Sequence, residues 1–245
     1  DDFGRQTELV DPAFGTVSYA YDCLDRLIYQ GSPSSDTEIK YDQLDRVVSK
    51  SMSDFEITYG YDAQLLGYPD YAETSSHIRT NYKYNALGNI LKQTDLSPEY
   101  SYAMLYSYDS DNRLDVITYP NGFEVRHIYQ SSNPGVLDEI KEVSTNNTIW
   151  KYTSENELGQ LTEFDLGNMT YNYEYWEPTG MTKRITNNNT FDHRYVFDPS
   201  NGNLSSREDF LKSLSEAFTY DNNRLTGYSN AGTPVSVEYN ATGNI

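Results

Sequence analysis

The sequence predicts an all-β protein built as a long antiparallel meander of stacked β-hairpins. Three observations lead to this fold class. A short motif recurs along the chain, as in YAYDCLDRLIYQGS, IKYDQLDRVVSKS and FTYDNNRLTGYS. Aromatic residues occur in pairs separated by two positions, which is the period of a β-strand. The chain also contains 24 tyrosines and 14% aromatic residues, although only 37% of its residues are hydrophobic, and tyrosine favours half-buried pleated surfaces.

Each copy of the motif centres on one aromatic residue, here called the anchor. The anchors are Tyr21, Tyr41, Tyr61, Tyr84, Tyr108, Tyr129, Tyr152, Tyr175, Phe197, Tyr220 and Tyr239. Their separations run from 19 residues (Tyr220 to Tyr239) to 24 residues (Tyr84 to Tyr108). The residues two positions before the anchors are Tyr19, Ile39, Tyr59, Tyr82, Tyr106, His127, Trp150, Tyr173, Tyr195, Phe218 and Val237. Because residues two apart share one face of a strand, each hairpin is expected to contribute this pair to a common core.

A tight turn is predicted after most anchors. The next residue is a short acid or amide that can hydrogen-bond the backbone two residues on: Asp22, Asp42, Asp62, Asn85, Asp109, Asp198, Asp221 or Asn240. A residue type that tolerates a left-handed backbone then closes a type I turn: Gly4, Asp25, Asp45, Gly88, Asn112 and Gly243, and Gly159 and Gly202 in longer copies. Turns are therefore expected near residues 23–25, 43–45, 86–88, 110–112 and 222–223.

A second strand is predicted after each turn, beginning with an aliphatic residue: Leu27, Val47, Ile90, Leu114, Leu161, Leu204 or Leu225. Asn121 and Gly122 in TYPNGFEV indicate a further hairpin turn. The segment SSREDFLKSLSEAF, Ser205 to Phe218, is compatible with a short amphipathic helix. Strand and loop are favoured there because Phe218 already belongs to an aromatic pair.

A single hairpin cannot bury enough surface to be stable, so neighbouring copies must supply the remaining contacts. Residues 1–245 are interpreted as one continuous array of about eleven repeats, or about 22 strands, cut through a repeat at both ends. A twisted sheet of this size has to curl. We therefore expect an arc, a spiral or a partial shell.

Composition limits the classes of partner. The net charge is −19, and without a basic stripe the chain is not expected to bind nucleic acid. No apolar run is long enough to span a bilayer. The first residues do not resemble a signal peptide, so the chain looks like a piece of a longer protein. The single cysteine, Cys23, excludes an intramolecular disulfide.

The repeats YDQLDRVV, YNALGNIL, YDSDNRLDVITYPNG and YDNNRLTGY resemble the tyrosine-aspartate (YD) repeats of the Rhs family. This family occurs in bacterial polymorphic toxins, in the cocoon-forming subunits of insecticidal toxin complexes and in teneurins. The resemblance implies a secreted or cell-surface bacterial protein whose β-sheet wall encloses a C-terminal toxin domain. The chain is too short for a closed cocoon and lacks both the self-cleaving core segment and a toxin domain. The string DPAFG, Asp11 to Gly15, is interpreted as a turn.

No residue is assigned to catalysis, and no metal, cofactor or ligand-binding residue is predicted. The histidines lie in unrelated positions, and structural roles are favoured for His77, His127 and His193. Cys23 lies in a predicted turn without a nearby histidine, so it is not interpreted as a nucleophile. A glycosidase pair such as Asp109 with Asp221 is conceivable, but turn formation already accounts for both carboxylates.

Three functions are weighed. The favoured one is a non-catalytic shell segment that encloses or shields a polypeptide cargo. The alternative is a carbohydrate-binding or cell-surface adhesion module that uses exposed tyrosines, and it would be supported by clustering of Tyr68, Tyr71, Tyr119 and Trp176. A glycoside hydrolase comes last. The unpaired strand edges left by a cut array are expected to cause edge-to-edge self-association.

Overall fold

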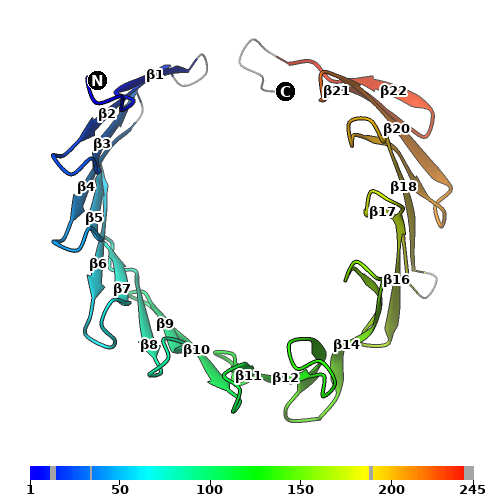
Figure 1. Cartoon of the computed structure of the whole chain (residues 1–245), viewed down its shortest axis with the longest axis horizontal. Coiled ribbons are helices and arrows are strands. Elements are labelled where there is room, and N and C mark those ends of the chain that lie inside the picture. Colours follow the sequence, from blue (N-terminus) through cyan, green and yellow to red (C-terminus); the bar gives the residue numbers. More distant parts are fainter. Residues whose placement is uncertain (12–14, 34, 188–189, 240–245) are drawn as a thin grey trace. The chain divides into compact units, whose positions relative to one another are not determined.

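The computed structural model describes residues 1–11, 15–33, 35–187 and 190–239 (Figure 1). Every regular element in these ranges is a β-strand, and there are 22 strands. The chain divides into two compact units, Asp1–Glu124 and Val125–Ile245. Each unit is a curved sheet whose strands follow one another in chain order (Figure 1).

The first unit contains strands β1 (Glu8–Asp11), β2 (Gly15–Tyr21), β3 (Leu27–Ser32), β4 (Ser35–Tyr41), β5 (Val47–Met52), β6 (Phe55–Tyr61), β7 (Pro69–Thr74), β8 (Arg79–Tyr84), β9 (Ile90–Leu96), β10 (Ser101–Tyr108) and β11 (Leu114–Thr118). Each of these strands pairs antiparallel with the next. The unit is therefore a simple meander.

The second unit follows the same pattern. Its strands are β12 (Glu124–Tyr129), which begins at the boundary, β13 (Leu137–Glu142), β14 (Thr148–Glu155), β15 (Leu161–Leu166), β16 (Met169–Trp176), β17 (Met181–Asn187), β18 (Phe191–Phe197), β19 (Leu204–Asp209), β20 (Leu214–Asp221), β21 (Arg224–Asn230) and β22 (Thr233–Ser236). Consecutive strands again pair antiparallel. The predicted all-β antiparallel meander is confirmed.

The predicted turns are also confirmed. Positive φ angles occur at Asp25 (63°), Asp45 (62°), Asn112 (63°), Gly4 (79°), Gly88 (87°), Gly159 (73°) and Gly202 (77°). The acid after the anchor binds the turn as expected, since Asp42 Oδ1 accepts hydrogen bonds from the amides of Leu44 (2.8 Å) and Arg46 (3.0 Å). Gly122 has a φ of 83°, and a turn separates β19 from β20 as favoured above. Asn240 and Gly243 lie outside the described residues, and so do the three central residues of DPAFG.

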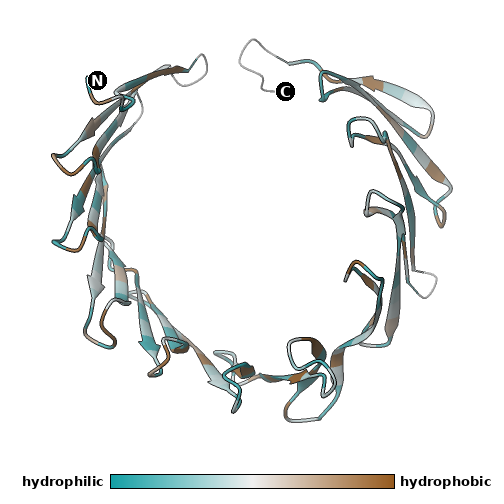
Figure 2. Ribbon diagram, in the orientation of Figure 1, coloured by the Kyte–Doolittle hydropathy of each residue, from teal (hydrophilic) through white to brown (hydrophobic). Residues whose placement is uncertain are grey.

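The expected common core does not form an enclosed interior. Strands alternate between a more buried face that carries the anchors, here called the anchor face, and an opposite reverse face; β2, for example, buries Val17, Tyr19 and Tyr21 more than Ser18 and Ala20. Among the described residues only Val17 (9% exposed) and Val125 (6%) are buried hydrophobics. Hydrophobic residues are scattered along the strands and turns (Figure 2). The physical reason is that each unit is a single-layer sheet in which strands contact only their sequence neighbours.

Candidate functional site

Six anchor tyrosines connect their hairpins to the preceding ones. The Tyr41 hydroxyl donates a hydrogen bond to the Leu27 carbonyl at 2.8 Å. The backbone pairing between β3 and β4 stops at Tyr29 opposite Glu38, two residues away from Leu27. The Tyr41 hydroxyl therefore supplies a donor to a carbonyl that lies beyond the end of this pairing. Equivalent bonds join Tyr21 to Gln6, Tyr61 to Val47, Tyr84 to Pro69, Tyr108 to Ile90 and Tyr175 to Leu161, at 2.7–2.9 Å. Phenylalanine could not make this bond, which explains the preference for tyrosine at the anchor.

An arginine after the left-handed residue links consecutive turns in the first unit. The Arg26 Nε atom donates to Asp22 Oδ2 in its own turn at 2.7 Å, and Nη1 donates to Asp45 Oδ1 in the next turn at 2.6 Å. The guanidinium carbon also lies 4.7 Å from the centre of the Tyr41 ring, a cation–π arrangement. Arg5 and Arg46 repeat these contacts one hairpin earlier and one later. Turn arginines and anchor tyrosines therefore form a continuous ladder along one rim of the sheet.

Amide side chains replace the arginine in other copies. Asn89 Nδ2 donates to Asn112 Oδ1 at 2.6 Å, and Asn203 Nδ2 donates to Asn223 Oδ1 at 3.1 Å. In these copies arginine meets aspartate and asparagine meets asparagine, whereas Gln160 Nε2 donates to the Gly180 carbonyl at 2.8 Å. This link between a turn and the following repeat was not predicted from the sequence.

The pH dependence of stability can test the contact between Arg46 and Asp62 in this ladder. Both Asp62 oxygens accept hydrogen bonds from Arg46, at 2.8 and 2.7 Å, and Oδ1 accepts the Gly67 amide at 2.7 Å. The Arg46 contacts first, and the Gly67 amide second, lower the pKa of Asp62 to about 2. A carboxyl whose pKa is lowered on folding stabilises the protein above its unfolded pKa of about 4. This contribution is lost as the pH falls through the folded value.

Asp62→Asn should therefore be less stable than the wild type at pH 7 and should lose less stability between pH 4 and pH 2. The measurement is the urea midpoint at pH 7, 4, 3 and 2. Asp54→Asn, which changes an exposed acid in the turn between β5 and β6, is the matched control. Equal acid-induced losses in wild type and Asp62→Asn would contradict the assigned role of this carboxylate.

The histidines and the cysteine do not assemble a catalytic centre. His77 lies in an exposed turn with a φ of 61°. His193 stacks on Phe191 at a centroid distance of 4.1 Å and its Nε2 lies 3.2 Å from Asp209, whereas His127 occupies its predicted aromatic position opposite Ile140. Cys23 is exposed. The described residues contain no cluster of three or more histidine, cysteine or acidic side chains suited to a metal ion.

The two carboxylates considered as a glycosidase pair both lie at turns. Asp109 Oδ1 accepts the amides of Asp111 (3.0 Å) and Arg113 (2.9 Å). The Arg113 side chain, and then its amide, lowers the pKa of Asp109, whereas a general acid needs a raised pKa. Asp221 accepts a hydrogen bond from the Asn222 side chain at 3.1 Å. The environment of Asp109 is therefore not that of a catalytic acid, and Asp221 has a contact within its own turn.

The four aromatic residues named as a test of a binding module occupy separate environments. Tyr68 packs against Tyr84 with ring centroids 5.1 Å apart. Tyr71 lies beneath the Arg79 guanidinium, whose carbon is 3.8 Å from the ring centre. The Trp176 indole donates to the Tyr195 carbonyl at 2.9 Å. Each of these three side chains has a local packing role.

Tyr119 belongs to an exposed aromatic cluster in the first unit. It packs on Phe123 at 5.9 Å, and Tyr102 packs on Tyr100 at 5.2 Å. Tyr102, Tyr119 and Phe123 line a shallow depression of about 420 Å³. Tyr100 and Tyr102 are 54% and 51% exposed. This cluster offers open aromatic faces of the kind on which sugar rings stack.

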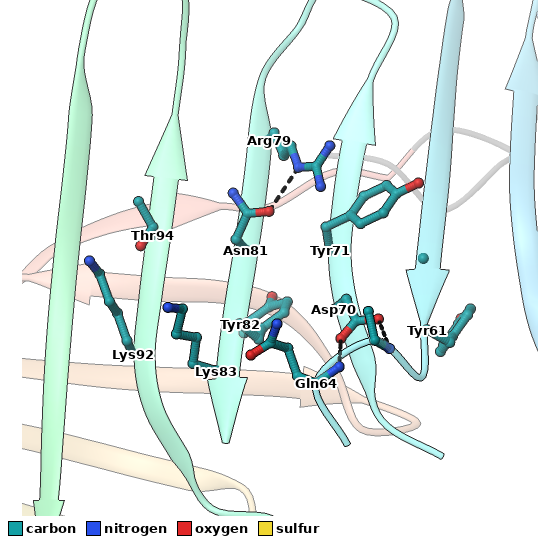
Figure 3. Close-up of a pocket in the computed structure, with 12 residues that line it drawn as sticks. Tyr61, Gln64, Asp70, Tyr71, Arg79, Asn81, Tyr82, Lys83, Lys92 and Thr94 are labelled. Carbon is teal, nitrogen blue, oxygen red and sulfur yellow. Dashed lines mark hydrogen bonds between the residues drawn. The ribbon is translucent and has the colours of Figure 1, made fainter. Parts of the chain in front are cut away.

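A larger depression of about 590 Å³ lies on the reverse face of β6 to β9 (Figure 3). Twelve residues line this depression, here called the basic depression, and six of them are Tyr71, Arg79, Asn81, Lys83, Lys92 and Thr94. All six lie on the same face. Arg79, Asn81 and Lys83 alternate along β8, Tyr71 on β7 pairs with Asn81, and Thr94 and Lys92 on β9 pair with Asn81 and Lys83. Of these six residues only Tyr71 was named from the sequence, as an aromatic residue that would support a binding module, and the basic residues were not predicted.

A row of exposed apolar residues marks the turn tips and was also missed. Leu24, Leu44, Leu87 and Leu158 occupy the same motif position and are 62–73% exposed. The sequence did contain a signal for this row, because an apolar residue that repeats at a turn position breaks the usual polar pattern of loops.

The part of the chain that the structure describes contains no helix that could cross a membrane. No family model matches the sequence, and no curated protein matches it.

Comparison with solved structures finds the same fold in toxin complexes. The crystal structure of TcdB2-TccC3 matches 92% of this chain with a TM-score of 0.75 at 16% identity. TcdB2-TccC3 without its hypervariable C-terminal region matches 99% with a TM-score of 0.75 at 14% identity, and the Tc holotoxin pore of Photorhabdus luminescens matches 92% with a TM-score of 0.73 at 16% identity. The chain spans 13–16% of the length of these proteins. At these identities the likeness establishes the fold: the chain has the architecture of a segment of TcdB2-TccC3.

Proposed function

We propose that this chain is a wall segment of an Rhs/YD-repeat shell protein, and that the wall is non-catalytic and encloses or shields a polypeptide cargo such as a C-terminal toxin domain. The observation that carries the proposal is the likeness in fold to TcdB2-TccC3 over 92–99% of the chain. It agrees with the independent resemblance of the YD motifs to toxin-complex subunits. Secretion or display at a bacterial cell surface follows from the same resemblance.

The local geometry supports a wall. Side-chain contacts join many hairpins to their neighbours, as those of Tyr41 and Arg26 do, so the sheet extends by adding similar units. A single layer leaves two faces for contact, one toward a cargo and one toward solvent. The net charge of −19 repels anionic membranes and nucleic acid and favours a basic cargo, which it holds in a salt-dependent way.

Protease protection of the cargo in the full-length parent protein tests this function. We expect the polypeptide that follows the repeats to be cleaved much more slowly in the intact protein than after isolation. Disrupting the wall with the double variant Tyr61→Ala/Tyr108→Ala should expose it, while Tyr100→Ala, at an exposed tyrosine, should not. Cleavage of the cargo in the intact protein at the rate of the isolated cargo would argue against enclosure.

The exposed aromatic cluster supports a second candidate function, a carbohydrate-binding or adhesion module. Neutral glycans that stack on aromatic rings are the ligands expected at Tyr102, Tyr119 and Phe123. A glycan array screened with the wild type and with Tyr102→Ala/Phe123→Ala tests it, and hydrolysis of any glycan would contradict the non-catalytic assignment. Edge-to-edge self-association remains a prediction, measured as size in solution.

A further inference from the structure

Two lysines on the reverse face lie directly opposite each other without an acidic partner. Lys83 on β8 pairs with Lys92 on β9, and Figure 3 shows the two side chains side by side. No carboxylate among the described residues forms a salt bridge with either ammonium group, although Lys141, Lys151, Lys183 and Lys212 each have one. Like charges placed directly opposite destabilise a sheet. The arrangement is notable in a chain with 37 acidic and 18 basic residues.

Two acidic groups at or beside the depression already have other partners. Glu73 forms a salt bridge with Arg79 at 3.0 Å. Asp70 is buried, and its two oxygens accept the amides of Ala63 (2.6 Å) and Gln64 (2.8 Å). Figure 3 shows these amide contacts on the side of the depression away from Lys92. The two ammonium groups therefore remain available to an external anion.

The remaining lining favours a polyhydroxylated ligand. Asn81 and Thr94 lie opposite each other, two residues along their strands from Lys83 and Lys92. Their amide and hydroxyl groups can form hydrogen bonds with sugar hydroxyls. A volume of about 590 Å³ lies within the range of small-molecule sites. An acidic peptide would gain less here, because a sheet face offers no free backbone edge for strand addition.

We propose that the basic depression binds an acidic sugar, in which a carboxylate or sulfate group lies between Lys83 and Lys92 and ring hydroxyls contact Asn81 and Thr94. This site is separate from the exposed aromatic cluster and does not depend on the wall function. In the free protein the repulsion between the two lysines destabilises this part of the sheet. The anionic group of a bound ligand neutralises that repulsion.

Calorimetric titration of the 245-residue chain at low ionic strength tests the site. The probes are a heparin-derived oligosaccharide (sulfated), oligogalacturonate (carboxylated), maltohexaose (neutral) and poly-glutamate (an acidic polypeptide). We expect one or both acidic sugars to bind, with affinity that falls as salt is added, and the comparison between them identifies the preferred anion. Lys83→Ala/Lys92→Ala should weaken binding at least about tenfold, because two charge-assisted hydrogen bonds are lost.

Lys40→Ala/Lys50→Ala is the matched control. It removes the same charge, but Lys40 faces Ser49 and Lys50 lies between Ile39 and Ile57, so binding should stay within about twofold. The Lys83→Ala/Lys92→Ala protein should melt at the same or a higher temperature than the wild type, because the repulsion is gone. Failure of both acidic sugars to bind, an equal loss in the control variant, or equally tight binding of poly-glutamate would each overturn the proposal.

Discussion

Tyr108→Ala should lower the free energy of unfolding of the first unit by about 2–4 kcal/mol, which is large for a side chain that is only half-buried. Two losses add up. The aromatic ring leaves the anchor face, where burial raises the pKa of the Tyr108 phenol. The hydroxyl bond to the Ile90 carbonyl, at 2.8 Å, is also lost, and an unsatisfied carbonyl beside the sheet has a cost of its own.

Two further variants separate these contributions. Tyr108→Phe keeps the ring and should lose about 1 kcal/mol, the usual net value of one hydrogen bond. Tyr100→Ala removes a ring that is 54% exposed and that contacts Tyr102. This change should alter stability by less than about 0.5 kcal/mol. Urea unfolding of the four proteins provides the comparison. If Tyr108→Phe were as destabilising as Tyr108→Ala, ring packing would have no role and the account of the anchor would be wrong.

Most of the strands and turns could be predicted because they depend on local chemistry. Each turn is fixed within five residues by two signals. A short acid accepts hydrogen bonds from the following amides, as Asp42 does, and a later residue tolerates a positive φ, as Asp45 does. The period-two aromatic pair then fixes which face of the strand is buried. None of these signals requires knowledge of a distant residue, so one sequence is sufficient.

The basic depression could not be predicted because it depends on the register of a strand pair. A one-residue shift separates the pair Tyr84 and Ile90 from the pair Lys83 and Lys92. Without this bulge Lys83 would lie opposite Leu91, and Lys92 would lie on the other face of the sheet. Similar shifts occur beside most anchors, for example at Tyr21, Tyr41 and Tyr61. The shift is a regular feature of these hairpins, but no register was assigned to the strand pairs from the sequence, and the two lysines were therefore not placed opposite each other.

The common core predicted from the aromatic pairs is an open face of the sheet. Residues two apart share one face of a strand, as predicted, but that face belongs to a single layer. Among the described strands each contacts only its sequence neighbours, so the anchors are half-buried by their neighbours along the sheet. The tyrosine hydroxyl and the turn arginine then stabilise contacts that a second layer would supply in a globular domain. This explains why a chain with a mean hydropathy of −0.74 can form an ordered sheet.

Gly60→Ala should destabilise the first unit by about 1–3 kcal/mol, the usual effect of inserting a methyl group into a packed site. Gly60 lies directly opposite Tyr71 across β6 and β7, and a Cβ atom at residue 60 would overlap with the Tyr71 ring carbon Cε1. Gly60 does not have a positive φ, so the cost is steric. The displaced ring would also lose its contact with the Arg79 guanidinium, now 3.8 Å from the ring centre.

A double-mutant cycle identifies this steric cause. In Gly60→Ala/Tyr71→Ala the ring is absent, so the added methyl should cost much less than in the single variant, giving a coupling of about 1 kcal/mol or more. Gly135→Ala is the control, because a Cβ there meets no atom within 4 Å and its φ is not positive. It should unfold at the same urea concentration as the wild type. Additive losses in the cycle would mean that glycine is required at residue 60 for the backbone itself, and that the ring of Tyr71 does not determine the choice.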